Sequence, residues 1–379
     1  MSEQRWQHTL DKITTWWLKN DLFDPAWIFQ FEAVFTEAYV IRGALARARL
    51  YARELGRAHA HAQEAQGPAF YDALLRAQTD EGIPPEERLQ RGIVAFCERV
   101  VDYQGVQGPA EALYMGYGVK VKDGLPEHSC VADQASTANA LLDAVETFPQ
   151  HPRVAVWLAC VRRWADWVLR EFALANGGVG VGIFGHRWNP IPEYWCATSL
   201  FASALFKLAR LTGESLYRER ALASLDWLAR FDHLHVEIPK FEDCPTEVIL
   251  YATEGIMEGL EYLAETQGIE RARSHPAADK YRQLAAWLVE NQLPSGRWPE
   301  PIARGYRPYS VGLPWELLRL ERLLGPEPRW RRCAARMLNF LSRREGEAYM
   351  GLYNRPFAMG LAFLSFSQAA LMQAAGRRE

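Results

Sequence analysis

Six prolines in this chain each precede a long apolar segment with helical periodicity, and this repeat constrains the fold more than any other feature. Proline is tolerated at the first position of a helix, because the N–H group that it lacks would have no partner there. Each of the middle four segments is followed by a short turn and then by a second, more charged helical segment. The six prolines are Pro25, Pro126, Pro192, Pro245, Pro314 and Pro356.

The repeated unit is therefore a helical hairpin. Its first helix is rich in Ala, Ser, Thr and Gly, which permits close packing on several sides. Its second helix has one apolar stripe and one charged face, as an outer helix should. The spacing is irregular, but the pattern is an internal repeat. Strand-like stretches are short and are confined to "YGVKVKDG" and "GGVGVGIFGHRW", so the sequence predicts an all-α protein.

We expect the hairpins to close into a ring. The helix near residues 4–20 has no partner before it, and the apolar helix after Pro356 has none after it. An open solenoid needs polar capping repeats at its ends, but the last helix is among the most apolar. The sequence predicts one (α/α)6 toroid domain over 1–379, closed by these two terminal helices, with a helical insertion at about 54–84. Another closed helical barrel and an open solenoid are the alternatives.

Composition excludes several classes of protein. The net charge is −3 and no polybasic block is visible, which argues against nucleic acid or an anionic membrane as the partner. The N-terminus lacks the features of a signal peptide, and no run has the roughly 18 apolar residues of a membrane span. The six cysteines are scattered without a CxxC motif. We expect buried, reduced thiols and a cytoplasmic protein.

No cofactor or metal site is expected. The two His of "HAHA" are two residues apart on a predicted helix, which splits their faces, and no HExxH motif occurs. The stretch "GGVGVGIFG" lacks the strand–turn–helix context of a dinucleotide fingerprint. A Ser-His-Asp triad has no supporting motif either.

With its hairpin repeat and the segments "TGESLYRERALASLDWL" and "NQLPSGRWPEP", the chain resembles the six-hairpin glycosidase superfamily. That superfamily includes unsaturated glucuronyl and rhamnogalacturonyl hydrolases, and related toroids serve as polysaccharide lyases and sugar epimerases. The resemblance implies a carbohydrate-active enzyme, with a glycoside hydrolase as the first expectation. "QLPSGRW" also matches a motif of terpene cyclases; alternatively, Gly296 makes a turn there and Trp298 packs the loop.

The loops before the apolar helices are the expected position of the site. They carry aromatic, His, Arg and carboxylate side chains at high density, and loops on one rim of a rigid scaffold are where sites are usually built. "PEHSC" and "PEYWC" are predicted to be the first turns of two neighbouring inner helices that face one cavity. Glu127 and Glu193 then serve either as dipole-stabilising residues or as catalytic groups.

Five residues are the leading candidates for catalysis: Asp133, Asp243, Glu193, His186 and Tyr194. Asp133 lies in an apolar inner helix, where poor hydration would favour the protonated form that a general acid requires. Asp243 is either a helix cap or a second carboxylate, and Glu247 is a weaker candidate of the same kind. Glu193, His186 and Tyr194 complete the set.

Arg187 and Trp188 are the leading candidates for substrate binding. An arginine can hold a carboxylate through two hydrogen bonds, and a tryptophan can stack on a sugar face. The other candidates for substrate contact are His128, Trp195, Trp298, Tyr309, Tyr353 and Arg355.

The same rim is rich in cations, which favours an anionic substrate such as a uronate-containing oligosaccharide. These cations are Lys120, Lys122, Arg187, Lys240, Arg297, Arg304, Arg307 and Arg355. Hydrolysis would need two carboxylates roughly 5–10 Å apart. A lyase or epimerase would instead use Tyr194, His186 and Arg187 to abstract a proton beside a uronate carboxylate. A terpene-cyclase-like enzyme and a non-catalytic glycan- or protein-binding toroid remain open.

Overall fold

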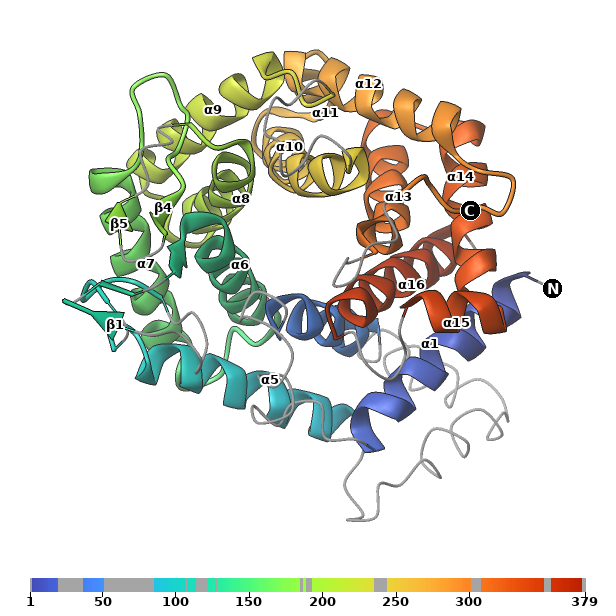
Figure 1. Ribbon diagram of the computed structural model, residues 1–379, viewed down its shortest axis with the longest axis horizontal. Coiled ribbons are helices and arrows are strands. Elements are labelled where there is room, and N and C mark those ends of the chain that lie inside the picture. The colour runs from blue at the N-terminus through green and yellow to red at the C-terminus, as the bar shows by residue number, and fades with distance from the viewer. Residues whose placement is uncertain are drawn as a thin grey trace.

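The protein is a closed ring of helical hairpins (Figure 1). The computed structural model describes residues 2–19, 37–50, 85–106, 108–113, 121–123, 125–126, 128–184, 187–188, 193–234, 244–300, 308–350 and 356–376. The predicted insertion at 54–84 lies outside these residues, and so does Pro25.

Two concentric sets of helices form the ring (Figure 1). The inner set comprises the helical residues 37–50, α6 (Val131–Thr147), α8 (Trp195–Thr212), α10 (Pro245–Gln267), α13 (Leu313–Leu324) and α16 (Pro356–Gly376). The outer set comprises α5 (Pro85–Asp102), α7 (Val154–Glu171), α9 (Ser215–Arg230), α12 (Pro276–Asn291), α14 (Pro328–Leu341) and α1 (Ser2–Lys19). Because each inner helix is followed by an antiparallel outer one, all inner helices begin at the same end of the ring, called the loop end below.

Short elements complete the described part of the fold. They are α11 (Ile269–Arg273), α15 (Arg344–Met350), the 3₁₀ helix η1 (Tyr309–Gly312), β1 (Val121–Lys122), β2 (Leu125–Pro126), β3 (His128–Cys130), β4 (Gly182–Phe184) and β5 (Arg187–Trp188). The strands β3, β4 and β5 form an antiparallel sheet in that order, and β1 pairs with β2. These strands include both of the short strand-like stretches expected from the sequence.

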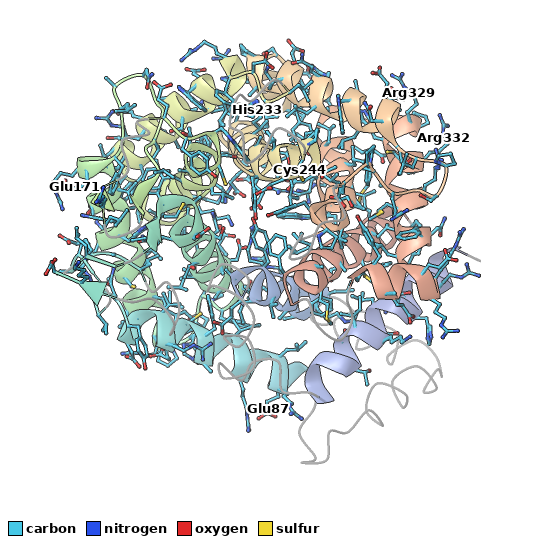
Figure 2. All side chains as sticks on the ribbon, viewed as in Figure 1. Glu87, Glu171, His233, Cys244, Arg329 and Arg332 are labelled. Carbon is cyan, nitrogen blue, oxygen red and sulfur yellow. The ribbon has the colours of Figure 1, made fainter. Side chains whose placement is uncertain are left out.

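Closure of the ring by the terminal helices is confirmed. Helix α1 packs against α16 and α14. The Trp6 indole N–H donates to Asn339 Oδ1 of α14 over 2.9 Å, and Lys12 pairs with Glu347 of α15 at 2.6 Å. The six outer helices, α1 among them, turn their charged faces outward; Glu87, Glu171 and Arg332 point away from the ring in Figure 2.

Small residues let the inner helices pack closely, as their composition predicts. Ser199 Oγ donates to the backbone oxygens of Tyr251 and Ala252 and accepts from the N–H of Gly255, which joins α8 to α10. A Cβ atom on Gly255 would lie 2.3 Å from the Ser199 carbonyl oxygen, so only glycine fits there. On the other side of α8, Asn139 Nδ2 donates to the Leu200 carbonyl.

The predicted helix starts at "PEHSC" and "PEYWC" are wrong. Pro126 lies in β2 and α6 begins five residues later, whereas α8 begins at Trp195, so Glu193 precedes that helix. The residues that immediately precede both helices, Cys130 and Tyr194, have extended backbones. Strand pairing explains this, because β3 pairs with β4 and the Tyr194 N–H donates to the Val179 carbonyl over 2.8 Å. By contrast, Pro245 and Pro356 do open their helices.

The six cysteines are all buried thiols, as the sequence predicts for most of them. None of the helices in the described part of the chain has the length and apolarity needed to cross a membrane.

Candidate active site at the loop end

Two carboxylates and a phenol come together from three successive inner helices at the loop end. Asp133 and Glu247 are the third residues of α6 and α10, and Tyr194 immediately precedes α8, which lies between them. All three side chains are half-buried. Both carboxylates are close enough to the Tyr194 hydroxyl to act on its ionisation. Asp133 and Tyr194 were both predicted catalytic residues, and the fold brings them together.

The Tyr194 phenol is held in its protonated form. Burial raises its pKa well above the ordinary value, and the Cys196 and Cys130 thiols and the carboxylates of Glu247 and Asp133 raise it further. A phenol in this state donates a hydrogen bond readily but is a poor general base at neutral pH.

Aromatic side chains form a layer directly beneath these groups. Tyr39 and Phe357 have ring centroids 5.2 Å apart, Phe357 and Tyr309 5.5 Å, Tyr309 and Tyr251 5.7 Å, and Tyr251 and Tyr39 6.4 Å. The four rings thus contact one another in a closed cycle, and they come from four different inner segments. Trp195 adds a fifth ring, 6.3 Å from Tyr251. All five rings are buried, so this aromatic layer is part of the packed interior of the ring.

Glu193 is not placed with this group. Its carboxylate accepts hydrogen bonds from Asn176 Nδ2 at 2.5 Å and from the Trp227 indole N–H at 3.4 Å. Trp227 belongs to the outer helix α9, so Glu193 is directed toward the outer ring and is exposed.

Three other predicted binding residues lie in the small sheet, at the periphery of the ring (Figure 1). Arg187 and Trp188 form β5, and His128 begins β3, so one three-stranded sheet carries all three residues. Arg187 is exposed, as is Lys122 of β1. This sheet leads directly into α6, which carries Asp133.

The remaining predicted aromatic residues are buried. Trp195 and Tyr309 belong to the aromatic layer described above. Trp298 is 2% exposed, and its indole N–H donates to the Leu288 carbonyl of α12. In the same turn, Gly296 has a φ of +96° and Gln292 donates to the Cys333 carbonyl of α14. The "QLPSGRW" segment therefore ties the outer helices α12 and α14 together.

Four predicted site residues lie outside the described residues, so the structure leaves their positions open. They are His186, Asp243, Tyr353 and Arg355.

Sequence reasoning missed the aromatic cycle and gave little weight to Glu247. Tyr39, Tyr251 and Phe357 look like ordinary core residues in apolar helices, and only the ring geometry brings them together. Glu247 carried a usable signal, because it occupies the third position of its helix, as Asp133 does. That equivalence was hidden by the misplaced start of α6.

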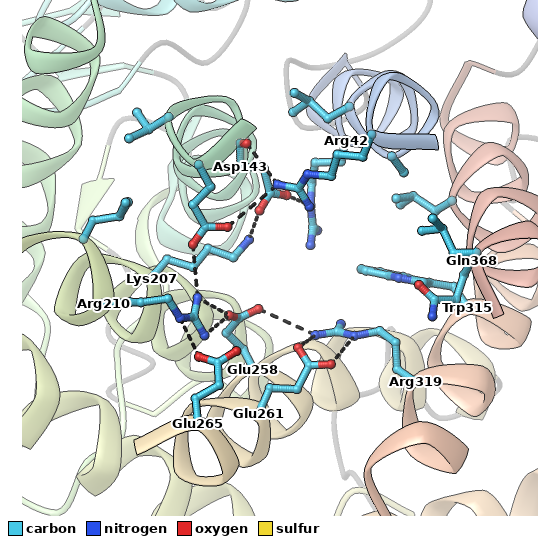
Figure 3. A pocket seen from close by; sticks show the side chains of 18 of the residues that line it. Arg42, Asp143, Lys207, Arg210, Glu258, Glu261, Glu265, Trp315, Arg319 and Gln368 are labelled. Carbon is cyan, nitrogen blue, oxygen red and sulfur yellow. Dashed lines mark hydrogen bonds and ion pairs between the residues drawn. The ribbon is translucent and has the colours of Figure 1, made fainter. Parts of the chain in front are cut away.

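A cavity of about 670 Å³ lies at the opposite end of the ring (Figure 3). It is lined by charged side chains from the C-terminal halves of inner helices, among them Asp143, Lys207, Glu258 and Arg319. The signal in the sequence was the presence of charges at intervals of three and four residues in otherwise apolar helices. Among the residues that the structure describes, no group of three or more His, Cys, Asp or Glu side chains could hold a metal ion.

Comparisons with known proteins support the fold alone. No family model matches the chain, and no curated protein matches it. The crystal structure of the Lin0763 protein from Listeria innocua is similar at a TM-score of 0.51 and 14% identity, over 89% of this chain and 86% of that one. A structure described as a possible member of the GH105 family from Salmonella enterica serovar Paratyphi A has a TM-score of 0.47 and 14% identity, over 75% and 95%. The architecture and the first similarity define the class: an all-α toroid of helical hairpins.

Proposed function

We propose that this protein is a carbohydrate-active enzyme, a glycoside hydrolase that cleaves an acidic oligosaccharide at the loop end of the ring. The observation that carries the proposal is the convergence of Asp133, Glu247 and Tyr194 above a layer of aromatic rings. Glycoside hydrolysis requires two carboxylates on either side of the scissile bond, and aromatic rings provide apolar surfaces on which sugar faces stack.

Asp133 is proposed as the general acid that protonates the leaving oxygen. Glu247 is proposed as the second carboxylate, acting as base or nucleophile; Asp243, from the segment just before α10, is the alternative. Tyr194 is proposed to donate a hydrogen bond to a sugar oxygen and so to orient the ring. Arg187 and Lys122, both exposed on the short strands that surround the starts of α6 and α8, support a negatively charged substrate, because an arginine can hold a carboxylate through two hydrogen bonds.

The state of Tyr194 favours hydrolysis over a lyase or epimerase reaction. Those reactions need a base that removes a proton beside the uronate carboxylate. Because burial raises the pKa of Tyr194, its phenolate is scarce at neutral pH and Tyr194 is a poor choice for that base. Two carboxylates beside a neutral phenol suit acid–base attack on a glycosidic bond instead.

The test is an activity screen on uronate-terminated oligosaccharides and their neutral counterparts. Asp133→Asn should retain the melting temperature and substrate affinity while lowering turnover by about 100-fold or more, the range of a lost general acid. Arg187→Ala should raise KM for the charged substrate more than for the neutral one. Asp226→Asn is the matched control, because Asp226 lies on the outer helix α9 and is more than half exposed.

Two results would contradict the proposal. If Asp133→Asn remains fully active, Asp133 is not the acid. If the purified protein releases no sugar from any charged substrate but forms an unsaturated product, the lyase alternative replaces hydrolysis.

A further inference from the structure

The cavity at the end opposite the candidate active site is an open pocket with a buried floor. Arg49, Glu265 and Arg322 at its rim have side-chain exposures of 41%, 55% and 58%. Arg42 and Lys207 at its floor are 4% and 3% exposed. Its volume of about 670 Å³ lies within the range of small-molecule sites.

One side of this pocket is rich in cations. Three basic groups surround the single carboxylate of Asp143: Lys207 Nζ at 2.5 Å and Arg42 Nε at 3.0 Å bind its carboxylate oxygens, and Arg49 donates to its backbone oxygen. Burial alone would raise the pKa of Asp143, but Lys207, Arg42 and Arg49 together hold it well below its usual range. This group of residues is called the Asp143 pole.

The adjacent wall has the opposite composition. Three carboxylates surround the single guanidinium of Arg210: Glu265 at 2.8 Å, and Glu146 and Glu258 at 3.1 Å each. Burial raises the pKa of Glu146, and the neighbouring carboxylates Asp143 and Glu258 add to the increase. This group is called the Arg210 pole. Figure 3 shows the two poles on one side of an open centre, with Arg319 and Trp315 on the other.

A purely structural role does not explain this arrangement. Burying ion pairs is costly, and well-packed apolar residues of similar volume usually stabilise a core as well or better. The same ring packs its interior nearer the loop end with buried aromatic side chains, so an apolar filling is compatible with this fold. Retaining separate cationic and acidic poles around an open cavity is the pattern of a binding site.

The arginine side chains of this pocket are held in fixed orientations, and its buried lysine has unused hydrogen-bond donors. The guanidinium carbons of Arg42 and Arg319 each lie 5.0 Å from the centre of the Trp315 ring, and such stacking fixes their orientation. Among the described residues, Lys207 Nζ donates to Asp143 only, so one of its three N–H groups is used. Figure 3 shows this ammonium group directed toward the open centre.

We propose that this pocket binds a small hydroxyl-bearing molecule with one anionic group, a sugar acid or a sugar phosphate, as a second ligand site distinct from the loop-end site. The anionic group binds Lys207, which has unused N–H groups, and lies beside Arg42, whose Nε donates to Asp143 and whose Nη1 donates to Glu254. The hydroxyl groups donate to Glu258 and Glu265 at the Arg210 pole, whose carboxylates would repel a second anionic group. This inference does not depend on the proposed hydrolase activity.

Isothermal titration calorimetry with glucuronate and glucose 6-phosphate tests the proposal, with glucose as the neutral probe and inorganic phosphate as the probe without a sugar. Glucuronate or glucose 6-phosphate, or both, should bind the wild type more tightly than glucose and inorganic phosphate do. Whichever of the two binds more tightly shows whether the anionic group of the ligand is a carboxylate or a phosphate. Lys207→Met should weaken that binding by about 10-fold or more, the effect of one charge-assisted hydrogen bond. Asp143 keeps its Arg42 partner in this variant. Lys12→Met, which removes an exposed lysine paired with Glu347 on the outer ring, should bind like the wild type.

Two further variants locate the binding. Gln368→Trp fills the pocket from α16 without removing an ion pair and should weaken binding even if Lys207→Met does not fold. Arg187→Ala alters only β5, which contributes no residue to this pocket, and should leave this binding unchanged. The proposal is overturned if neither sugar anion binds the wild type at millimolar concentration, or if glucose or phosphate alone binds equally well. It also fails if Gln368→Trp binds normally, if a folded Lys207→Met binds normally, or if Arg187→Ala abolishes binding.

Discussion

Adding one methyl group at Gly255 should test how closely the inner helices pack. A Cβ atom there would lie 2.3 Å from the Ser199 carbonyl oxygen, which is 1.1 Å inside the 3.4 Å limit of ordinary contact. The atom that it meets belongs to the backbone of α8, so no side-chain rotation can relieve the clash. Overpacking of this kind costs up to about 3 kcal/mol, and the higher helix propensity of alanine offsets about 1 kcal/mol. We expect Gly255→Ala to lower the free energy of unfolding by about 2 kcal/mol.

Gly259, one turn further along α10, is the matched control. A Cβ atom there meets only the side-chain tips of Leu225 and Phe206, at 2.8 Å, and these can shift. The same gain in helix propensity applies, so Gly259→Ala should be close to neutral, within about 1 kcal/mol. Urea unfolding followed by far-UV circular dichroism measures both variants. Equal stabilities for Gly255→Ala and Gly259→Ala would refute the close contact between α8 and α10.

Three other outcomes follow from the described contacts. Removing residues 2–19 should lower the free energy of unfolding by several kcal/mol, at ~25 cal/mol per Å² of apolar surface exposed; an unchanged urea midpoint would show that α1 does not close the ring. Burial raises the pKa of Glu316 to about 8 from 4.5, so the folded state keeps a proton that the unfolded state loses, and stability falls as pH rises between these values. Glu316→Gln should therefore reduce the loss of stability between pH 5 and pH 8, and an unchanged pH profile would contradict the assignment. Glu193→Gln should change turnover by less than about 2-fold, because its carboxylate faces the outer ring; a loss comparable to that of Asp133→Asn (about 100-fold) would return Glu193 to the catalytic group.

The architecture could be predicted because it follows from patterns that are local in sequence. Apolar helices rich in small residues alternate with amphipathic ones, and the first and last helices each lack a partner within a hairpin. A closed ring, in which these two helices pack together, therefore satisfies the whole pattern. The starts of α6 and α8 could not be predicted in this way. A proline and a carboxylate favour a helix start, but pairing of β3 with β4 is a long-range interaction that no local pattern reveals.

The candidate site could be predicted only in part for a related reason. Asp133 and Tyr194 stand out as polar groups near the start of apolar helices, so sequence identifies them. The aromatic cycle depends on rings from residues 39, 251, 309 and 357 meeting across the channel, and the charged pocket depends on charges from several helices. Such arrangements are set by the relative rotation of the helices, which one sequence does not specify.

A chain of hydrogen bonds connects the aromatic layer to the charged pocket. The Tyr39 hydroxyl donates to Glu254, which accepts from Arg42 at 2.5 Å, and Arg42 in turn binds Asp143. A ligand that draws Arg42 toward itself takes a hydrogen-bond donor away from Glu254. The hydrogen bond from Tyr39 to Glu254, which holds the Tyr39 ring in the layer, then changes as well. Any free energy transmitted along this path is reciprocal. A substrate at the loop end would then alter affinity in the charged pocket by the same factor as a pocket ligand alters affinity for substrate.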